Sequence, residues 1–154
     1  MKKTYPVYVI LTLAVFASAA FMAGSNFNVF LDLPSMAIVF VPLIFMLLTV
    51  YTPSEMADAF RSAMKGKKAT EDDLEKACLF FEGAQQMIYR IALTATLFGV
   101  ILILSSISRP EELGRGFAVA ILTVFYALVA GFLVIVPFKT AVKKRLLEKR
   151  DQQF

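Results

Sequence analysis

The chain has 154 residues, of which 58% are hydrophobic and 18% charged, with a mean hydropathy of +0.70 and a net charge of +4. Soluble domains contain about 45–50% apolar residues, so this composition excludes an ordinary soluble domain and indicates an integral membrane protein. With no histidine and a single cysteine, the chain also lacks the ligands for a His/Cys metal site.

The first apolar stretch covers residues 7–24 and follows Lys2 and Lys3. About 20 helical residues cross a bilayer, so this stretch predicts a first transmembrane helix. Its Ala17-Ser18-Ala19 sequence also resembles the cleavage site of a signal peptide. Because the apolar run exceeds the usual ~7–15 residues of a signal peptide, we expect an uncleaved helix.

The second apolar stretch, residues 34–52, begins with a proline and follows a short loop. Proline fits the first turn of a helix, where its missing N–H costs nothing. Asp32 stands two residues earlier, a position typical of a turn or cap residue. Pro42 lies inside the stretch and predicts a kink.

A polar segment, residues 53–86, separates the second and third spans. Thr52-Pro53-Ser54-Glu55 is typical of a capping box and predicts a short helix to about Met64. A break at residues 65–68 follows, and the acidic run 70–73 starts another helix. Residues at helical spacing predict that this helix continues into the third span: Leu74, Cys78, Phe81, Gln85 and Ile88.

The third and fourth spans are predicted over residues 87–107 and 116–138, joined by a short outer loop, residues 108–115. A basic tail follows, residues 139–154. A basic run beside a membrane is typical of attraction to anionic lipids, which we favour over nucleic-acid binding.

Of the 16 basic residues, 13 lie in the N-terminus, between the second and third spans, or in the tail, and Arg90 lies at the adjoining end of the third span. Basic residues favour the cytoplasmic side, so both termini are predicted to be cytoplasmic. The predicted fold is a single all-α membrane domain with four transmembrane helices and a short cytoplasmic helical segment.

Mostly small or hydroxylated residues follow one another at helical spacing in the third and fourth spans. They are Ala92, Thr96, Gly99, Ile103 and Ser106 in the third span, and Gly116, Ala120, Thr123, Ala127 and Gly131 in the fourth. Such faces permit close helix packing, the interpretation that composition alone favours, or they line a pore. None of the four spans contains Asp, Glu or His, and a threonine hydroxyl does not release a proton near neutral pH.

Several motifs of the chain occur in a recognisable order. In the third and fourth spans they are Ala95–Gly99, Arg109-Pro110, Leu113-Gly114, Ala118–Thr123, Tyr126 and Pro137. Upstream they are Gly24-Ser25, Phe30–Ser35 and Ile38-Val39. Together, across both membrane halves, these motifs resemble the flagellar stator A-subunits, the four-span branch of the MotA/TolQ/ExbB proton channel family.

This resemblance implies a homopentamer in the bacterial inner membrane. Its third and fourth helices form a pore around two copies of a single-span B-subunit (MotB/TolR/ExbD-like). The intramembrane Asp of the B-subunit carries H⁺ or Na⁺. The residues expected on the pore face are Ala92, Thr96, Gly99, Ala120, Thr123 and Ala127. Asp32 is expected at an outer gate and Pro137 at a kink that couples ion passage to movement. The resemblance implies no cofactor and no enzymatic activity.

Three departures from the family pattern qualify this picture. The segment from Pro53 to Met87 is much shorter than in flagellar A-subunits, Val124 replaces a second threonine, and no proline stands near Arg90. The driven machine and the ion stay open, with protons slightly favoured. The alternative is a small four-helix membrane scaffold without ion transport. A self-sufficient transporter is disfavoured because the spans hold no acidic group.

Overall fold

The computed structural model describes residues 5–22, 24, 30–64, 69–105 and 110–151, and contains helices and short connections with no strand in these ranges. The helical segments are α1 (Tyr5–Met22), α2 (Leu33–Val50), α3 (Pro53–Met64), α4 (Glu71–Ser105), α5 (Pro110–Ala130), the π-helical turn η3 (Gly131–Ile135) and α6 (Val136–Arg150). Four stretches of the described chain are long and apolar enough to cross a membrane: Tyr5–Met22, Leu33–Val50, Glu71–Ser105 and Leu113–Arg150. The predicted all-α fold with four spans is confirmed.

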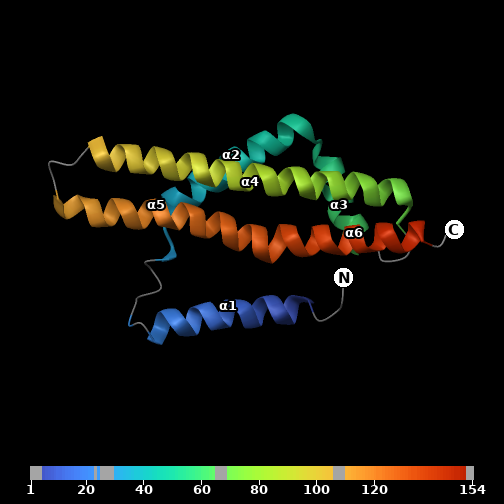
Figure 1. The fold of residues 1–154 in the computed structure, drawn as a ribbon, viewed down its shortest axis with the longest axis horizontal. Coiled ribbons are helices and arrows are strands. Elements are labelled where there is room, and N and C mark those ends of the chain that lie inside the picture. The colour runs from blue at the N-terminus through green and yellow to red at the C-terminus, as the bar shows by residue number, and fades with distance from the viewer. Residues whose placement is uncertain (1–4, 23, 25–29, 65–68, 106–109, 152–154) are drawn as a thin grey trace.

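Two long antiparallel helices form the centre of the molecule (Figure 1). One is α4, and the other is the continuous succession of α5, η3 and α6. On this pair, α2 packs against α4 and α5, while α3 packs against α4 and α6. We call α3, residues 71–86 of α4, and α6 the stalk. Helix α1 runs beside α5 and α6 and has no buried residue.

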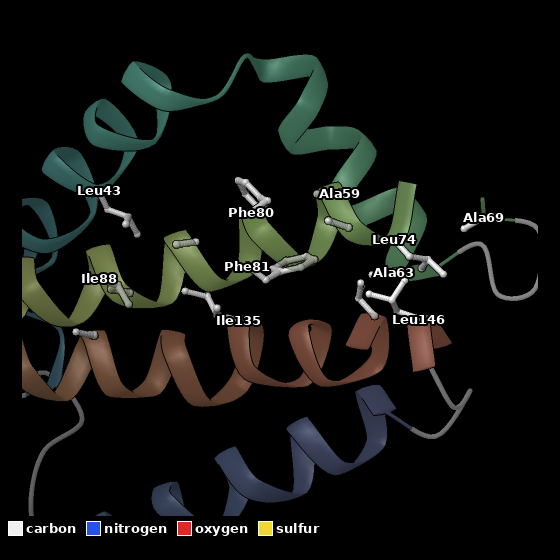
Figure 2. Packing of buried hydrophobic residues seen from close by; sticks show 14 of the residues in the cluster. Leu43, Ala59, Ala63, Ala69, Leu74, Phe80, Phe81, Ile88, Ile135 and Leu146 are labelled. Carbon is white, nitrogen blue, oxygen red and sulfur yellow. The ribbon is translucent and has the colours of Figure 1, made fainter. Parts of the chain in front are cut away.

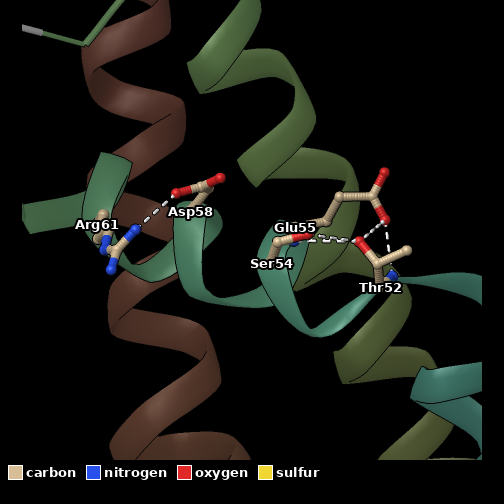
Figure 3. Close-up of polar contacts among 5 residues, drawn as sticks. All are labelled: Thr52, Ser54, Glu55, Asp58 and Arg61. Atoms are coloured by element: carbon tan, nitrogen blue, oxygen red, sulfur yellow. Dashed lines mark hydrogen bonds and ion pairs between the residues drawn. The ribbon is translucent and has the colours of Figure 1, made fainter.

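Side-chain caps mark the starts of α3 and α4, and the cap of α3 is the predicted capping box. The backbone N–H of Thr52 donates to Glu55 Oε2 at 2.7 Å, and the Glu55 N–H donates to Thr52 Oγ1 at 3.3 Å (Figure 3). At the start of α4, Thr70 and Asp73 exchange the same pair of bonds at 3.1 and 3.2 Å. Such reciprocal bonds satisfy N–H groups that have no partner in the first turn of a helix, which explains why α3 and α4 begin at these residues.

The core lies where the stalk helices meet and extends along the two long helices to Val39 and Leu43 of α2 (Figure 2). Three members of the predicted stripe, Leu74, Phe81 and Ile88, are fully buried, and Cys78 and Gln85 are half-buried. Burial, reinforced by the charge of Glu82, raises the pKa of the Cys78 thiol. The thiol therefore stays protonated near neutral pH and behaves as a small packing group.

Aromatic rings join the stalk helices to one another. Phe60 of α3 meets Phe80 and Phe81 of α4 edge-on, with ring centroids 5.9 and 5.1 Å apart. It also meets Phe138 of α6 edge-on at 5.2 Å. Edge-to-face packing of this kind adds to the stabilisation from burial alone, so α3 is held by rings from both of the long helices.

One expectation about the second half of the chain needs correction. The loop predicted over residues 108–115 extends too far, because α5 already begins at Pro110. Proline is favoured at the first helical position, which agrees with a helix that begins at Pro110. Lys2, Lys3, the predicted break at residues 65–68, and Arg109 lie outside the described residues.

Candidate functional site

The two small-residue faces predicted for the third and fourth spans pack against each other in antiparallel order. A Cβ atom on Gly99 would lie 3.5 Å from Ala120 Cβ, and one on Gly116 would lie 2.6 Å from Ile103 Cγ1. Because these glycines have no side chain, α4 and α5 approach closely. The residues predicted for the pore face are buried (Ala92, Ala120, Thr123 and Ala127) or half-buried (Thr96 and Gly99). Within one subunit this is close helix packing, and the pore-lining role stays a prediction.

The two mid-span threonines meet across this α4–α5 seam. Thr96 Oγ1 and Thr123 Oγ1 lie 2.9 Å apart, and the Thr123 hydroxyl donates to the Ala120 carbonyl at 2.7 Å. Since a hydroxyl has one proton, Thr96 is the donor within the threonine pair. The Thr96 hydroxyl also lies 3.4 Å from the Ala120 carbonyl oxygen, so both hydroxyl groups are hydrogen-bonded within the seam.

A groove of about 450 Å³ runs along one side of the seam. Thr123, Ala120 and Gly99 contribute to its wall, and Ile38 of α2 contributes from the neighbouring helix. Apart from Thr123, the polar lining residue is Arg115, near the start of α5 and far from the stalk. The groove therefore runs from Thr123 to the Arg115 end of the span.

Asp32 caps helix α2 and ties it to α5. Its Oδ2 atom accepts from the Ser35 N–H at 2.9 Å and also from the Ser35 hydroxyl. The backbone N–H of Asp32 donates to the Tyr126 hydroxyl at 2.9 Å, and this hydroxyl donates to the Phe30 carbonyl at 2.7 Å. The cap interpretation describes these contacts, whereas the outer-gate role stays a prediction.

Pro137 lies directly after a change in helix type. Gly131–Ile135 forms a π-helical turn in which the Val136 N–H bonds to the Gly131 carbonyl, and Pro137 follows in the first turn of α6. Short π segments occur often at functional sites in helices. The position fits the predicted kink, and the coupling role stays a prediction.

The basic tail is helical to Arg150, and its side chains bond mainly to the stalk. Arg145 donates to the Ser62 and Ala63 carbonyls at the end of α3, at 3.2 and 2.6 Å. Lys139 pairs with Glu82 at 3.3 Å. Lys149 and Arg150 bind the start of α4 through the Ala69 carbonyl, Glu71 and Glu75. These contacts give the tail a structural role within the chain that composition did not predict.

Tyrosine contacts were the main feature that sequence reasoning missed. Tyr126 is part of the family resemblance, which assigns it no contact. Tyr51 packs over Gly83, and its hydroxyl donates to the Leu79 carbonyl at 3.3 Å. A phenol inside or beside an apolar span needs a hydrogen-bond partner, and this requirement was the available signal.

Among the described residues, no three His, Cys, Asp or Glu side chains lie close enough together to hold a metal ion. The model of the MotA/TolQ/ExbB proton channel family matches residues 36–153, which takes in most of α2 and everything from α3 to α6 but none of α1. No curated protein matches the chain. The family match covers more than half of the sequence, and it includes both helices of the seam. The chain is therefore a multi-pass membrane protein that belongs to the MotA/TolQ/ExbB proton channel family.

Proposed function

We propose that the chain is the channel-forming A-subunit of an ion-driven motor complex. Five copies surround the helices of two copies of a single-span B-subunit, and the intramembrane Asp of the B-subunit carries H⁺ or Na⁺. The complex lies in the bacterial inner membrane with both termini of the A-subunit in the cytoplasm, and its stalk passes movement to the driven machine. Family membership supports the channel function, and the finer assembly is part of the proposal.

The threonine pair beside the groove carries this proposal. Thr96 and Thr123 offer hydroxyl oxygens at mid-span, while the four predicted spans contain no acidic residue or histidine. A hydroxyl pair stabilises a passing cation or water but does not bind and release protons near neutral pH. A complete ion pathway therefore requires a carboxylate from another chain, and the family pattern supplies one on the B-subunit.

The proposed orientation rests on charge and on the course of the chain. The start of α1 and the end of α6 lie at the same end of the molecule (Figure 1), beside the stalk. Most of the lysines and arginines that the structure describes lie at the same end, and such residues favour the cytoplasmic side of a membrane. Arg115 lies near the start of α5, at the end of the molecule away from the stalk.

The assembly is tested on complexes purified from the native membrane through a tag on this chain. We expect native mass measurement to find five copies with two copies of a protein that has one apolar span and an Asp near the start of that span. A homo-oligomer without any single-span partner contradicts the proposal.

The ion pathway is tested by flux into vesicles that contain the complete complex. Thr123→Leu fills the wall of the groove with an apolar side chain and is expected to abolish partner-dependent flux. Thr123→Ser keeps the hydroxyl and is expected to retain flux. Thr49→Leu is the matched control, because Thr49 is exposed on α2 and bonds only to its own helix at Phe45. Unchanged flux in an assembled Thr123→Leu complex rejects the pathway.

A second candidate function is a four-helix membrane scaffold that transports no ion. The observation in its favour is that the small faces of α4 and α5 cover each other within one subunit, with Thr123 bonded to its own helix. The scaffold predicts an assembled protein without a B-subunit and without flux, so the mass measurement separates the two functions.

A further inference from the structure

The junction between α5 and α6 contains a carbonyl that lacks its usual donor. In an α-helix the N–H of residue 137 would bond to the carbonyl of Leu133, four residues earlier. Residue 137 is a proline and has no N–H. Carbonyl groups in an apolar environment need a partner from within the protein, so a donor from another part of the chain is favoured here.

Tyr5 of α1 provides that donor. Its hydroxyl donates to the Leu133 carbonyl oxygen, across 128 positions of the sequence. Its ring packs edge-on against Phe138, the residue after Pro137, with centroids 5.9 Å apart and an interplanar angle of 85°. One side chain therefore contacts both sides of the proline.

The rest of α1 makes few contacts with the other described helices. None of its residues is buried, and the side-chain bonds of Thr12 and Ser18 stay within α1, to the Tyr8 and Val15 carbonyls. Between α1 and α5 there is an apolar cavity of about 350 Å³ in place of close packing. Tyr5 is thus the residue through which α1 bonds to α5 and α6 in the described chain.

The same contact reaches the stalk. Phe138 meets Phe60 of α3 at 5.2 Å and Phe81 of α4 at 5.7 Å between ring centroids. On the opposite side of the junction, a Cβ atom on Gly131 would lie 3.0 Å from the Tyr89 hydroxyl. The π turn therefore contacts both α1 and α4, and Phe138 joins it to the stalk.

We propose that Tyr5 is a latch that docks α1 onto the π turn by replacing the donor that Pro137 lacks. Docking of α1 and the hydrogen-bond pattern of the α5–α6 junction are consequently coupled. A change at the junction that gives the Leu133 carbonyl another donor releases α1, and loss of the Tyr5 hydroxyl does the same. This coupling does not depend on ion passage or on a B-subunit.

The test compares Tyr5→Phe, which keeps the ring and removes the hydroxyl, with Tyr8→Phe as the matched control on the same helix. Tyr8 is 64% exposed. Spin labels at Ala17 and Phe125, which both line the α1–α5 cavity, report the spacing of the two helices. The labelled full-length chain carries Cys78→Ser and is diluted with unlabelled chain in vesicles, so that distances within one subunit dominate.

We expect Tyr5→Phe to broaden the distance distribution and Tyr8→Phe to leave it unchanged. Pro137→Ala restores an N–H within the helix, so adding Tyr5→Phe to that variant should change the distribution little further. In SDS titration, Tyr5→Phe should lower the folded-to-unfolded ratio about fivefold, the usual effect of one hydrogen bond. The same substitution in Pro137→Ala should lower the ratio less than about twofold.

Two outcomes overturn the latch. One is that Tyr5→Phe and Tyr8→Phe behave alike in both measurements. The other is that Tyr5→Phe has an equal effect with and without Pro137, because the hydroxyl would then act independently of the missing N–H.

Discussion

The hydroxyl oxygens of Thr96 and Thr123 lie 2.9 Å apart between the two long helices. Each belongs to a face of small residues, and the two faces meet from Gly116 to Thr123. The contact both satisfies two polar groups inside an apolar span and places them beside a groove. Packing and the proposed ion pathway thus depend on the same pair, and the two contributions must be measured separately.

The contribution of the threonine pair to stability is expected to be modest. Interhelical hydrogen bonds in membranes contribute about 0.6 kcal/mol on average, with values up to ~1.7 kcal/mol. A double-mutant cycle of Thr96→Val and Thr123→Val, measured by SDS titration, should give a coupling free energy in this range. Thr94→Val is the control, since Thr94 is an exposed threonine on the same helix. A coupling free energy of zero would show that the two hydroxyls do not stabilise the seam.

Gly116 is expected to tolerate no larger side chain. An added Cβ atom would lie 2.6 Å from Ile103 Cγ1, and overpacking of this kind costs about 1–3 kcal/mol. Gly116→Ala should therefore lower the free energy of unfolding by that amount. Adding Ile103→Ala should recover part of the loss by making room.

Gly114 provides the matched control for that measurement. Nothing lies within 4 Å of a Cβ atom placed on it, and alanine favours a helix over glycine by up to about 1 kcal/mol. Gly114→Ala should leave the free energy of unfolding unchanged or raise it. Equal destabilisation by the two alanines would contradict the close contact at Gly116.

The start of α3 is expected to lose stability in acid. The backbone N–H and the hydroxyl of Thr52 donate to the Glu55 carboxylate and hold the pKa of Glu55 below its ordinary value of 4.5. A lowered pKa means that this carboxylate stabilises the folded segment above its ordinary pKa, and that the contribution is lost as the pH falls through the lowered pKa. Protection of α3 amides from hydrogen exchange, corrected for the intrinsic effect of pH, should decrease in that window.

Two variants identify Glu55 as the titrating group. Glu55→Gln should remove its part of the acid-dependent decrease, and Thr52→Val should shift the carboxyl midpoint of Glu55, followed by ¹³C NMR, towards 4.5. A midpoint for Glu55 at or above its ordinary value in the parent chain would contradict the capping box.

Arg145 is expected to hold the end of α3 on α6. Its guanidinium donates to the last-turn carbonyls of Ser62 and Ala63, and hydrogen bonds to charged groups contribute about 1.5–3 kcal/mol. Arg145→Met should therefore increase tryptic cleavage after Arg61 by about tenfold or more. Lys144→Met is the control, because the Lys144 side chain is 77% exposed and pairs only along its own helix with Glu148 at 3.9 Å. Equal cleavage of the two variants would mean that Arg145 does not hold α3.

Much of the fold was accessible from the sequence because its signals are local. Thr52 and Glu55 stand three residues apart, as do Thr70 and Asp73, and each pair marks the start of a helix that the structure contains. The unbroken passage of α4 into the third span was likewise predicted from residues at helical spacing. The early start of α5 at Pro110 was missed because an acidic segment was read as a loop.

Only part of the candidate site could be predicted from the sequence. The small residues of the third and fourth spans could be assigned to one face of each helix, but the partner of each face could not. Close packing and pore lining require the same residue types, so composition does not separate them. The structure brings the two faces together, while the pore role depends on further subunits and a partner.

By itself the sequence determined that the chain is helical, that four stretches are apolar enough to cross a membrane, and where several helices begin. These properties depend on runs of apolar residues and on caps within a few positions. Only the tertiary structure decided that Thr96 meets Thr123, that Arg145 holds α3, and that Tyr5 bonds to Leu133. Such contacts join residues far apart in the chain, and their geometry arises from the packing of whole helices, which no local pattern encodes.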